Sequence, residues 1–215
     1  MFKLRPLFCN SMEKFRVDIE YLILTLGAGT DSRTRETLAR VGKKLIELRE
    51  KGLAMINHSA AELVCVKHFT RGDYDVDVEV PLAEDLVCDI YAKKKDETCI
   101  LEVETGFVPP ENALDPILYR ETRIASKIAR YGKYAKRFGL GTPSYHKLQI
   151  PEVLLSPPGE RDGQALVDLK HLCSRYYTNP PITLAELRSA HLDFICMINV
   201  DEQKVTEIEP RDYVG

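Results

Sequence analysis

The sequence lacks the residue patterns that mark the commoner metal and nucleophile sites. Its six cysteines are scattered without a CxxC pair, which argues against a zinc ribbon and a clustered iron–sulfur site, so buried free thiols are expected. The five histidines share no HxxxH or HxH spacing, so they are expected mostly at the surface or at helix caps. The net charge is only −3, and a polyanion would therefore have to meet a local basic patch.

Long apolar runs and glycine-rich phosphate loops are also missing. The longest early apolar stretch, YLILTLGA at 21–28, is far too short to cross a bilayer, and the N-terminus lacks a sustained apolar segment. Residues 27–32, GAGTDS, lack the third glycine of a dinucleotide-binding loop, so no organic cofactor is expected. Together these absences predict a cytoplasmic protein with reduced thiols and no membrane partner.

Three helices are expected first, and then the period of the sequence changes. Residues 11–26 favour a helix, with a strand left open by their β-branched centre; Asp31 or Ser32 begins a charged helix to about 51, and a third starts near 57–59. Residues 74–80, YDVDVEV, then alternate as in a strand. Tyr74, Val76, Val78 and Val80 share one face, and the solvated face carries Asp73, Asp75, Asp77 and Glu79, of which Asp75 or Asp77 could border a site.

The rest of the chain continues with strands and helices in a legible order. Two strands are predicted at 86–94 and 98–106, joined by a hairpin turn at KKKDE. A long helix follows over 116–138, with Pro116 in its first turn and Gly139 just past its end, and a strand interrupted by Pro151 follows over 147–156. The last part holds a helix near 161–176, a short helix begun by Thr183, and a hairpin turning at 201–203.

The segment CILEVETG at 99–106 carries two carboxylates on one strand. Glu102 and Glu104 point to the same face, and Asp89 on the preceding strand lies beside them if the hairpin pairs in its simplest register. Three carboxylates in one small volume suppress one another's ionisation unless a cation neutralises them. Because oxygen ligands select hard ions, the pattern indicates a Mg²⁺ or Mn²⁺ site.

These residues, in this order, resemble the core of the PD-(D/E)XK nuclease superfamily. Glu62 stands on a helix in AAELVCVKHF, Asp89 follows, and Glu102 comes thirteen residues later, followed by Val103, by a polar residue, by a basic helix and by a strand. The resemblance covers roughly residues 57–157. Within the superfamily, this segment is similar to archaeal Holliday-junction resolvases and RecB-type nuclease domains. Glu104 occupies the usual lysine position, which makes this an ExE variant, and Cys88 stands in the proline position.

The resemblance implies a fold and a division of the chain. The expected class is α/β, a restriction-endonuclease-like core of order αβββαβ with a mixed central sheet flanked by helices and extended at both ends. The divisions are an N-terminal helical extension, 1–56, the nuclease core, 57–157, and C-terminal helices and a hairpin packed on the core, 158–215.

The resemblance also implies a reaction, the metal-dependent hydrolysis of DNA phosphodiester bonds. Asp89, Glu102 and the backbone carbonyl of Val103 would hold Mg²⁺ or Mn²⁺, and Glu62 would contribute directly or through water. Glu104 could deprotonate the attacking water or bind a second ion. Lys127, which with Tyr131 is similar to the Q/K-xxx-Y element of RecB-like nucleases, could stabilise the developing negative charge.

A row of basic and tyrosine side chains on the helix after the catalytic strand suits phosphate and base contacts. The row consists of Arg123, Lys127, Arg130, Tyr134 and Arg137. Tyr131, on the same helix, is a further candidate contact and either packs in the core or faces the site. Taken alone, such a row is more often a solvated face. A homodimer cutting branched repair or recombination intermediates is one expectation, an inactive DNA-binding protein on the same fold is the alternative, and an accessory protein without nucleic-acid affinity is a third.

Overall fold

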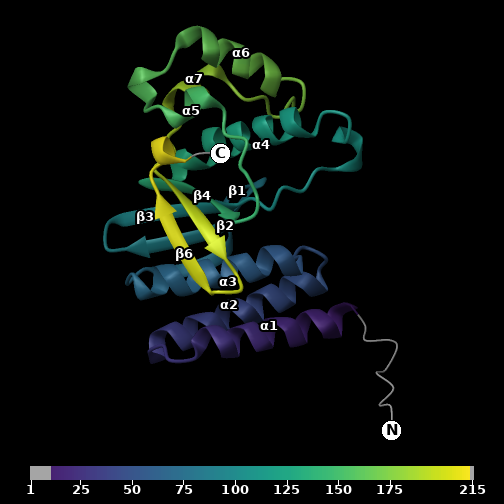
Figure 1. Ribbon diagram of the computed structural model, residues 1–215, viewed down its shortest axis with the longest axis vertical. Coiled ribbons are helices and arrows are strands. Elements are labelled where there is room, and N and C mark those ends of the chain that lie inside the picture. Colours follow the sequence, from purple (N-terminus) through teal and green to yellow (C-terminus); the bar gives the residue numbers. More distant parts are fainter. Residues whose placement is uncertain (1–10, 214–215) are drawn as a thin grey trace.

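A mixed β-sheet lies between two layers of helices in the computed structural model, which describes residues 11–213 (Figure 1). Helices α1 (Ser11–Gly27), α2 (Ser32–Glu50) and α3 (Ile56–Arg71) cover one face. Helices α4 (Pro116–Tyr131), α5 (Glu152–Leu155), α6 (Gly163–Cys173) and α7 (Leu184–Ser189) lie on the other side. The strands are β1 (Asp75–Ala83), β2 (Leu86–Lys94), β3 (Glu97–Val103), β4 (Arg137–Pro143), β5 (Phe194–Asn199) and β6 (Lys204–Ile208).

Within the described residues the six strands form one sheet in chain order, β1 to β6. Strands β1, β2 and β3 pair antiparallel, β3, β4 and β5 pair parallel, and β6 returns antiparallel to β5. Because parallel neighbours need a crossover, α4 connects β3 to β4, and the segment holding α5, α6 and α7 connects β4 to β5. The C-terminal hairpin therefore extends the same sheet as the central strands.

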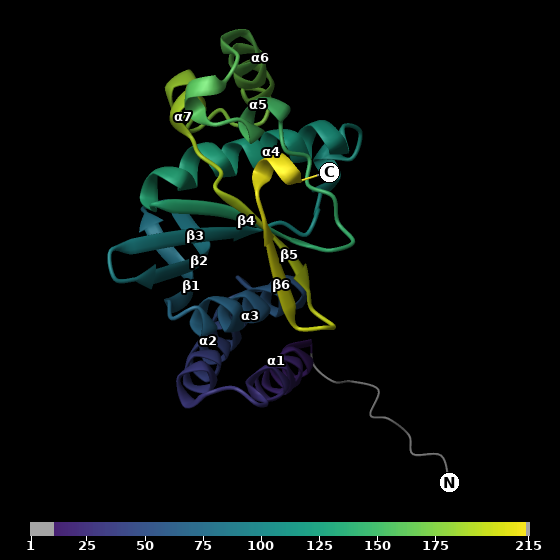
Figure 2. The same ribbon diagram turned by 60° about the vertical axis from the view of Figure 1, so that its left-hand side comes forward.

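The N-terminal segments follow the predicted pattern. Residues 11–27 are helical, so the strand left open for them is wrong, and Asp31 caps α2 by accepting a hydrogen bond of 2.7 Å from the backbone N–H of Thr34. Helix α3 lies against the sheet, with α1 and α2 packed beneath it (Figure 2). Phe15, Leu38 and Leu63 from the three helices join one buried cluster with Leu101 of β3.

Two of the predicted elements are wrong at the centre of the fold. The helix predicted over 116–138 ends at Tyr131, and after a short 3-10 turn the chain enters β4 at Arg137. Residues 147–156, predicted as the fourth strand, hold only the single helical turn α5, at 152–155. The order of helix, three strands, helix and strand over α3 to β4 agrees with the prediction, but a different segment supplies the last strand.

Strand β1 does not keep one face of the sheet along its whole length. Val76 and Val78 join the core under α3, whereas Val80, predicted on the same face, packs against the core under α4. The change occurs at Glu79, whose φ of 48° is a left-handed conformation. Strand β2 changes face at the matching place, because Cys88 belongs to the α4 core and Ile90 to the α3 core.

The later elements and the thiols agree with the sequence. Thr183 begins α7 through a reciprocal capping box with Glu186, and β5 and β6 form the predicted hairpin. The five cysteines that the structure describes are buried with free thiols, while Cys9 lies outside the described residues. Among the described helices, none has the length and apolar character that a membrane span requires.

Candidate functional site

Asp89 and Glu102 are held side by side where β2 and β3 diverge. The backbone pairing of the two strands ends at Ile90 and Leu101. Beyond that pair, the backbone N–H of Asp89 donates to Glu102 Oε1 at 2.9 Å, and the N–H of Val103 donates to Asp89 Oδ2 at 2.6 Å. The carboxylates thus replace strand carbonyls as acceptors, which fixes both side chains and satisfies buried amides.

The ammonium group of Lys127 lies among the carboxylates. Its Nζ is 2.6 Å from Glu104 Oε1, 3.0 Å from Glu102 Oε2 and 3.5 Å from Asp89 Oδ2. It also donates to the backbone carbonyl of Val103 at 3.4 Å. The side chain comes from the buried side of α4, a helix that lies across the sheet (Figure 2). The helix and the strands together bring the predicted residues into one cluster.

These contacts shift the protonation of the cluster in opposite directions. Burial alone would neutralise Lys127, but the charges of the three carboxylates outweigh it and raise its pKa well above the ordinary lysine value. Burial acts against the ionised form of Asp89 too, yet Lys127 and His58 hold the pKa of Asp89 below its usual range. Burial and the neighbouring charge of Asp89 raise the pKa of Glu102, so among the three carboxyl groups that contact Lys127 a proton is retained most readily on Glu102.

Arg123 completes the cationic side of the cluster. Its Nε donates to both oxygens of Glu104, at 3.0 and 3.1 Å. Although Glu104 is buried, Lys127 and Arg123 lower its pKa below the ordinary value. A carboxylate paired in this way is a weak base, and its main effect is to position the two cations.

A second group of ligating side chains lies on the α3 side of Asp89. His58 Nε2 is 3.4 Å from Asp89 Oδ1, and ligand atoms of His58, Glu62 and Glu79 all lie within 4.8 Å of one another. Val78 pairs with Ile90 and Val80 with Cys88, which puts Glu79 opposite Asp89. The left-handed backbone at Glu79 therefore brings an acidic residue from an expected solvent face into this group.

Glu62 is the residue of this group whose burial is not offset by a hydrogen bond. Its side chain is buried, and neither carboxylate oxygen has a hydrogen-bond partner among the described residues. Burial raises the pKa of Glu62 to about 8. The hydrogen bond and charge of Asp89 prevail over burial at the neighbouring imidazole and raise the pKa of His58 to about 9. A buried carboxyl without a donor is the arrangement that a bound cation would satisfy.

The charges of the combined cluster fit a divalent ion. Among the described residues it contains five carboxyl groups, Asp89, Glu62, Glu79, Glu102 and Glu104, and three cationic groups, His58, Arg123 and Lys127. Glu62 and Glu102, whose pKa values are raised, can keep protons when no ion is bound, and one divalent cation would take the place of those two protons. One imidazole and two carboxylates are ligands that Mn²⁺ accepts readily, while Mg²⁺ prefers oxygen ligands alone.

Two hollows give access to the cluster. The larger, of about 520 Å³, is lined by His58, Glu79, Glu104 and Arg123, together with exposed apolar side chains. These apolar side chains are Leu53, Met55, Phe107 and Tyr145, each at least 65% exposed. The smaller hollow, of about 260 Å³, contains Asp89, Glu102, Lys127, Arg130 and Tyr131.

Only part of the predicted nucleic-acid row faces these hollows. Arg123, Lys127, Arg130 and Tyr131 line the smaller one, and the Tyr131 hydroxyl donates to the carbonyl of Val87 at 3.1 Å. Tyr134 lies in the 3-10 turn after α4 and packs against the α4 core.

Arg137 begins β4 and lies over the ring of Phe194, in ion pairs with Glu97 and Glu207. The continuous helical row from Arg123 to Arg137 is therefore wrong, because the helix ends before its last two members.

Four side chains of the site were not expected from the sequence. His58 was expected at the surface or at a helix cap, since a histidine without a spaced partner gives no ligand signal, and Glu79 was expected on a solvated strand face. Phe107 and Tyr145 lie in loops, where no periodicity draws attention to them. A usable signal for His58 was its place four residues before Glu62, on the same helical face.

The chain was compared with protein-family models, with curated proteins and with solved structures. None of the three comparisons found a match. A function for the protein must therefore be argued from the cluster, the hollows and their chemistry.

Proposed function

We propose that the protein is a metal-dependent nuclease that hydrolyses DNA phosphodiester bonds on a restriction-endonuclease-like core. The observation that carries the proposal is the buried, unpartnered carboxylate of Glu62, which lies within ligand distance of His58 and Glu79 and beside Asp89. The arrangement α3, β1, β2, β3, α4 and β4 supports the family resemblance, because the acidic residues come from the expected three elements.

His58, Glu62 and Glu79 would hold the divalent ion, and Asp89 would orient the imidazole ring of His58 through its contact with that ring. When bound, the ion lowers the pKa of a water molecule and polarises the phosphoryl oxygen. Because the ligands include an imidazole, Mn²⁺ supports the reaction better than Mg²⁺.

The basic residues of α4 bind the scissile phosphate. Arg123 lines both hollows, and Lys127 and Arg130 line the smaller one, so a phosphodiester at the mouth of the cluster meets three cations. Water adds to phosphorus while the bond to the leaving oxygen breaks, yielding a phosphomonoester and a hydroxyl group. Arg123 and Lys127 stabilise the negative charge that develops on the phosphoryl oxygens, and Glu104 keeps both cations in position.

The aromatic side chains beside the larger hollow favour a substrate with unpaired bases. Phe107 is 71% exposed and Tyr145 is 86% exposed, and both line the hollow that holds His58 and Arg123. Exposed rings beside cations are typical of surfaces on which bases stack. Flaps and other branched repair intermediates with single-stranded parts contain such bases, and a homodimer would offer one site to each of two strands.

The test is cleavage of a panel of junction, flap, single-stranded and linear duplex DNAs with Mn²⁺, with Mg²⁺ and with EDTA. We expect cutting with Mn²⁺, weaker cutting with Mg²⁺ and none with EDTA. Glu62→Gln should lose at least a hundredfold in rate while keeping DNA affinity, because it removes a metal ligand without touching the basic residues. Asp168→Asn, an exposed change on α6, is the matched control and should cut normally. A metal-independent rate, or full activity of Glu62→Gln, would refute the proposal.

A second function, DNA binding without cleavage, is favoured by the position of Lys127. Its ammonium contacts Asp89, Glu102 and the carbonyl of Val103, the three groups that the resemblance assigns to the metal. A permanent lysine there would exclude an ion from that set. Under this alternative the same DNAs are bound in EDTA and none is cut with either metal.

A further inference from the structure

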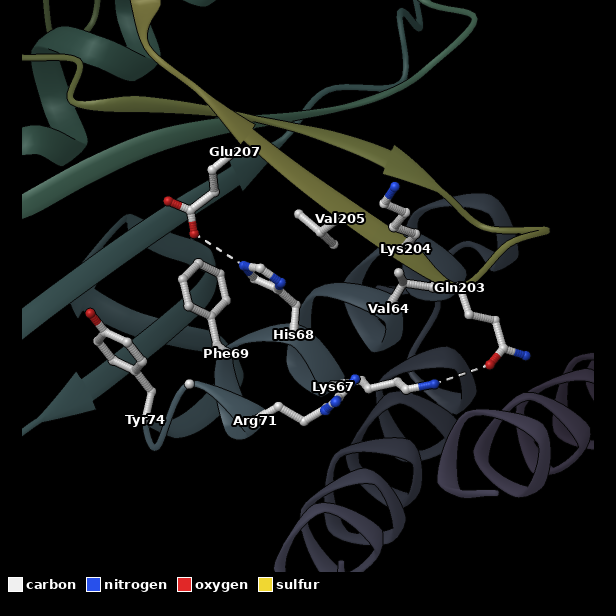
Figure 3. Close-up of a pocket in the computed structure, with 11 residues that line it drawn as sticks. Val64, Lys67, His68, Phe69, Arg71, Tyr74, Gln203, Lys204, Val205 and Glu207 are labelled. Carbon is white, nitrogen blue, oxygen red and sulfur yellow. Dashed lines mark hydrogen bonds and ion pairs between the residues drawn. The ribbon is translucent and has the colours of Figure 1, made fainter. Parts of the chain in front are cut away.

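A third hollow, of about 410 Å³, lies at the other end of α3, between that helix and β6 (Figure 3). Lys67, His68 and Arg71 line it from the helix, and Lys204 and Glu207 line it from the strand. His58 and His68 are ten helical residues apart, so the hollow is about 15 Å from the carboxylate cluster. It is therefore separate from the site described above.

The hollow contains more positive charge than its neighbours neutralise. Among the described residues that line it, Glu207 is the one carboxylate, and it is bound by His68 at 3.0 Å and by Arg137 at 3.3 Å. Lys67 donates to the neutral side-chain oxygen of Gln203 at 3.2 Å (Figure 3). Within residues 11–213, neither Arg71 nor Lys204 has a side-chain hydrogen bond or ion pair.

Two of these cations repel each other. Lys67 and Arg71 are four residues apart on α3, so they lie on the same helical face. Partial burial and the charge of Arg71 lower the pKa of Lys67. Such a like-charge pair on one helical face is unfavourable, and an anion between the two groups would relieve the repulsion.

We propose that this hollow binds a phosphoryl group, as a terminal phosphate monoester. The guanidinium of Arg71 can bind two phosphate oxygens at once, and Lys67 supplies a second charge from the same helical face. Val64, Phe69 and Val205 also line the hollow, so an apolar part of a larger ligand can pack beside the phosphate. The phosphate belongs either to a small nucleotide or to the end of a nucleic-acid strand.

The experiment measures binding by the full chain in EDTA, so that neither metal nor cleavage contributes. The probes for calorimetric titration at low salt are inorganic phosphate, adenosine monophosphate, a 5′-phosphorylated oligothymidine and the same oligothymidine with a 5′-hydroxyl. We expect the phosphorylated oligonucleotide to bind at least tenfold more tightly than the hydroxyl form. The double variant Lys67→Gln/Arg71→Gln should lose this difference, and Lys43→Gln on α2, whose side chain is 81% exposed, should keep it.

The remaining outcomes separate the two sources of the phosphate. Binding of adenosine monophosphate with the same loss in the double variant identifies a small nucleotide, whereas binding of the phosphorylated oligonucleotide alone identifies a strand end. Equal affinity for the two oligonucleotides together with no binding of adenosine monophosphate, or an unchanged affinity for every probe in the double variant, overturns the proposal. Arg71→Gln alone serves if the double variant does not fold, because Arg71 is exposed. Since no metal is present, a failure of the proposed nuclease activity leaves these results unaffected.

Discussion

Lys127 carries the positive charge that the buried carboxylates of β2 and β3 require. Only 9% of its side chain is exposed, and it contacts Asp89, Glu102 and Glu104 together. Taking such a cation out of water is costly, and the three contacts and the carbonyl of Val103 offset that cost. Removing one partner of a buried charge cluster leaves the others uncompensated.

We therefore expect Lys127→Met to reduce the free energy of unfolding by about 3–5 kcal/mol at pH 8. Without the ammonium, the pKa of Glu102, which is already raised in the folded protein, rises further, and the pKa of Glu104 loses the main charge that lowers it. The folded variant then binds more protons than the unfolded chain, so it loses stability as the pH rises and recovers as the pH falls toward 5. Urea unfolding at pH 5 and pH 8 measures this. Lys133→Met, at an exposed ion pair with Glu186, is the control, and an equal loss at both pH values would contradict the account.

The grouping of Asp89, Glu102, Glu104 and Lys127 could be expected from the sequence, because strand alternation puts Glu102 and Glu104 on one face and the family resemblance singles out Asp89 and Lys127. Glu79 and His58 could not be predicted in the same way. Strict alternation assigns Glu79 to the solvent face, and only the left-handed backbone at that residue turns its carboxylate toward His58 and Glu62. Local backbone irregularities of this kind have no reliable signature in a single sequence.

At the scale of whole elements, β4 is the strand that sequence patterns could not reveal. Its residues, RFGLGTP, contain two glycines and a proline, which are depleted in strands. The structure gives the reason for Gly139: a Cβ atom there would lie 2.3 Å from the ring of Phe194 on β5. The glycine is required by packing between parallel neighbours, so tertiary contacts override local propensity.

Gly139→Ala should accordingly destabilise the protein by roughly 1–3 kcal/mol, the usual cost of inserting a methyl group into a full core. The clash involves the ring of Phe194, which is buried in the α3 core and packs against Phe69 and Arg137, so it has little room to move away. Thermal and urea unfolding measure the change. Gly159→Ala, where an added Cβ meets no atom within 4 Å, is the matched control. Equal stability of the two variants would show that β4 and β5 are not packed in this way.

At the scale of the whole molecule, the proposed site joins both faces of the sheet. Asp89 contacts His58 from the α3 side and Lys127 from the α4 side, and the hollows beside it carry the basic residues of α4. Under the proposed function, DNA would meet Arg123, Lys127 and Arg130 beside the carboxylates, although the net charge of the chain is negative. The α/β class and the helical layers were predictable, but the joining of the C-terminal hairpin to the central sheet was not, because strand order depends on long-range pairing.

The proposed DNA contact predicts a definite salt dependence. If Arg123, Lys127 and Arg130 each neutralise one phosphate of a single strand, the logarithm of the binding constant falls with the logarithm of salt concentration with a slope of about −2. Arg123→Gln/Arg130→Gln should flatten that slope to about −0.7. Fluorescence anisotropy in EDTA measures both. Arg40→Gln/Lys44→Gln, at ion pairs with Asp77, is the control, and an unchanged slope in the first variant would place the DNA elsewhere.

The change of face within β1 and β2 has a consequence for how the protein opens. Val76 and Val78 anchor one part of β1 in the layer of α3, and Val80 anchors the next part in the layer of α4. Strand β1 is at the edge of the sheet, with β2 as its neighbour. Because β1 packs into both helical layers, neither layer can separate from the sheet without disrupting the packing of β1. Fraying from that edge is therefore coupled to loss of both layers, and the amide protons of β1 that are bonded to β2 should exchange with solvent as slowly as those of the interior strands.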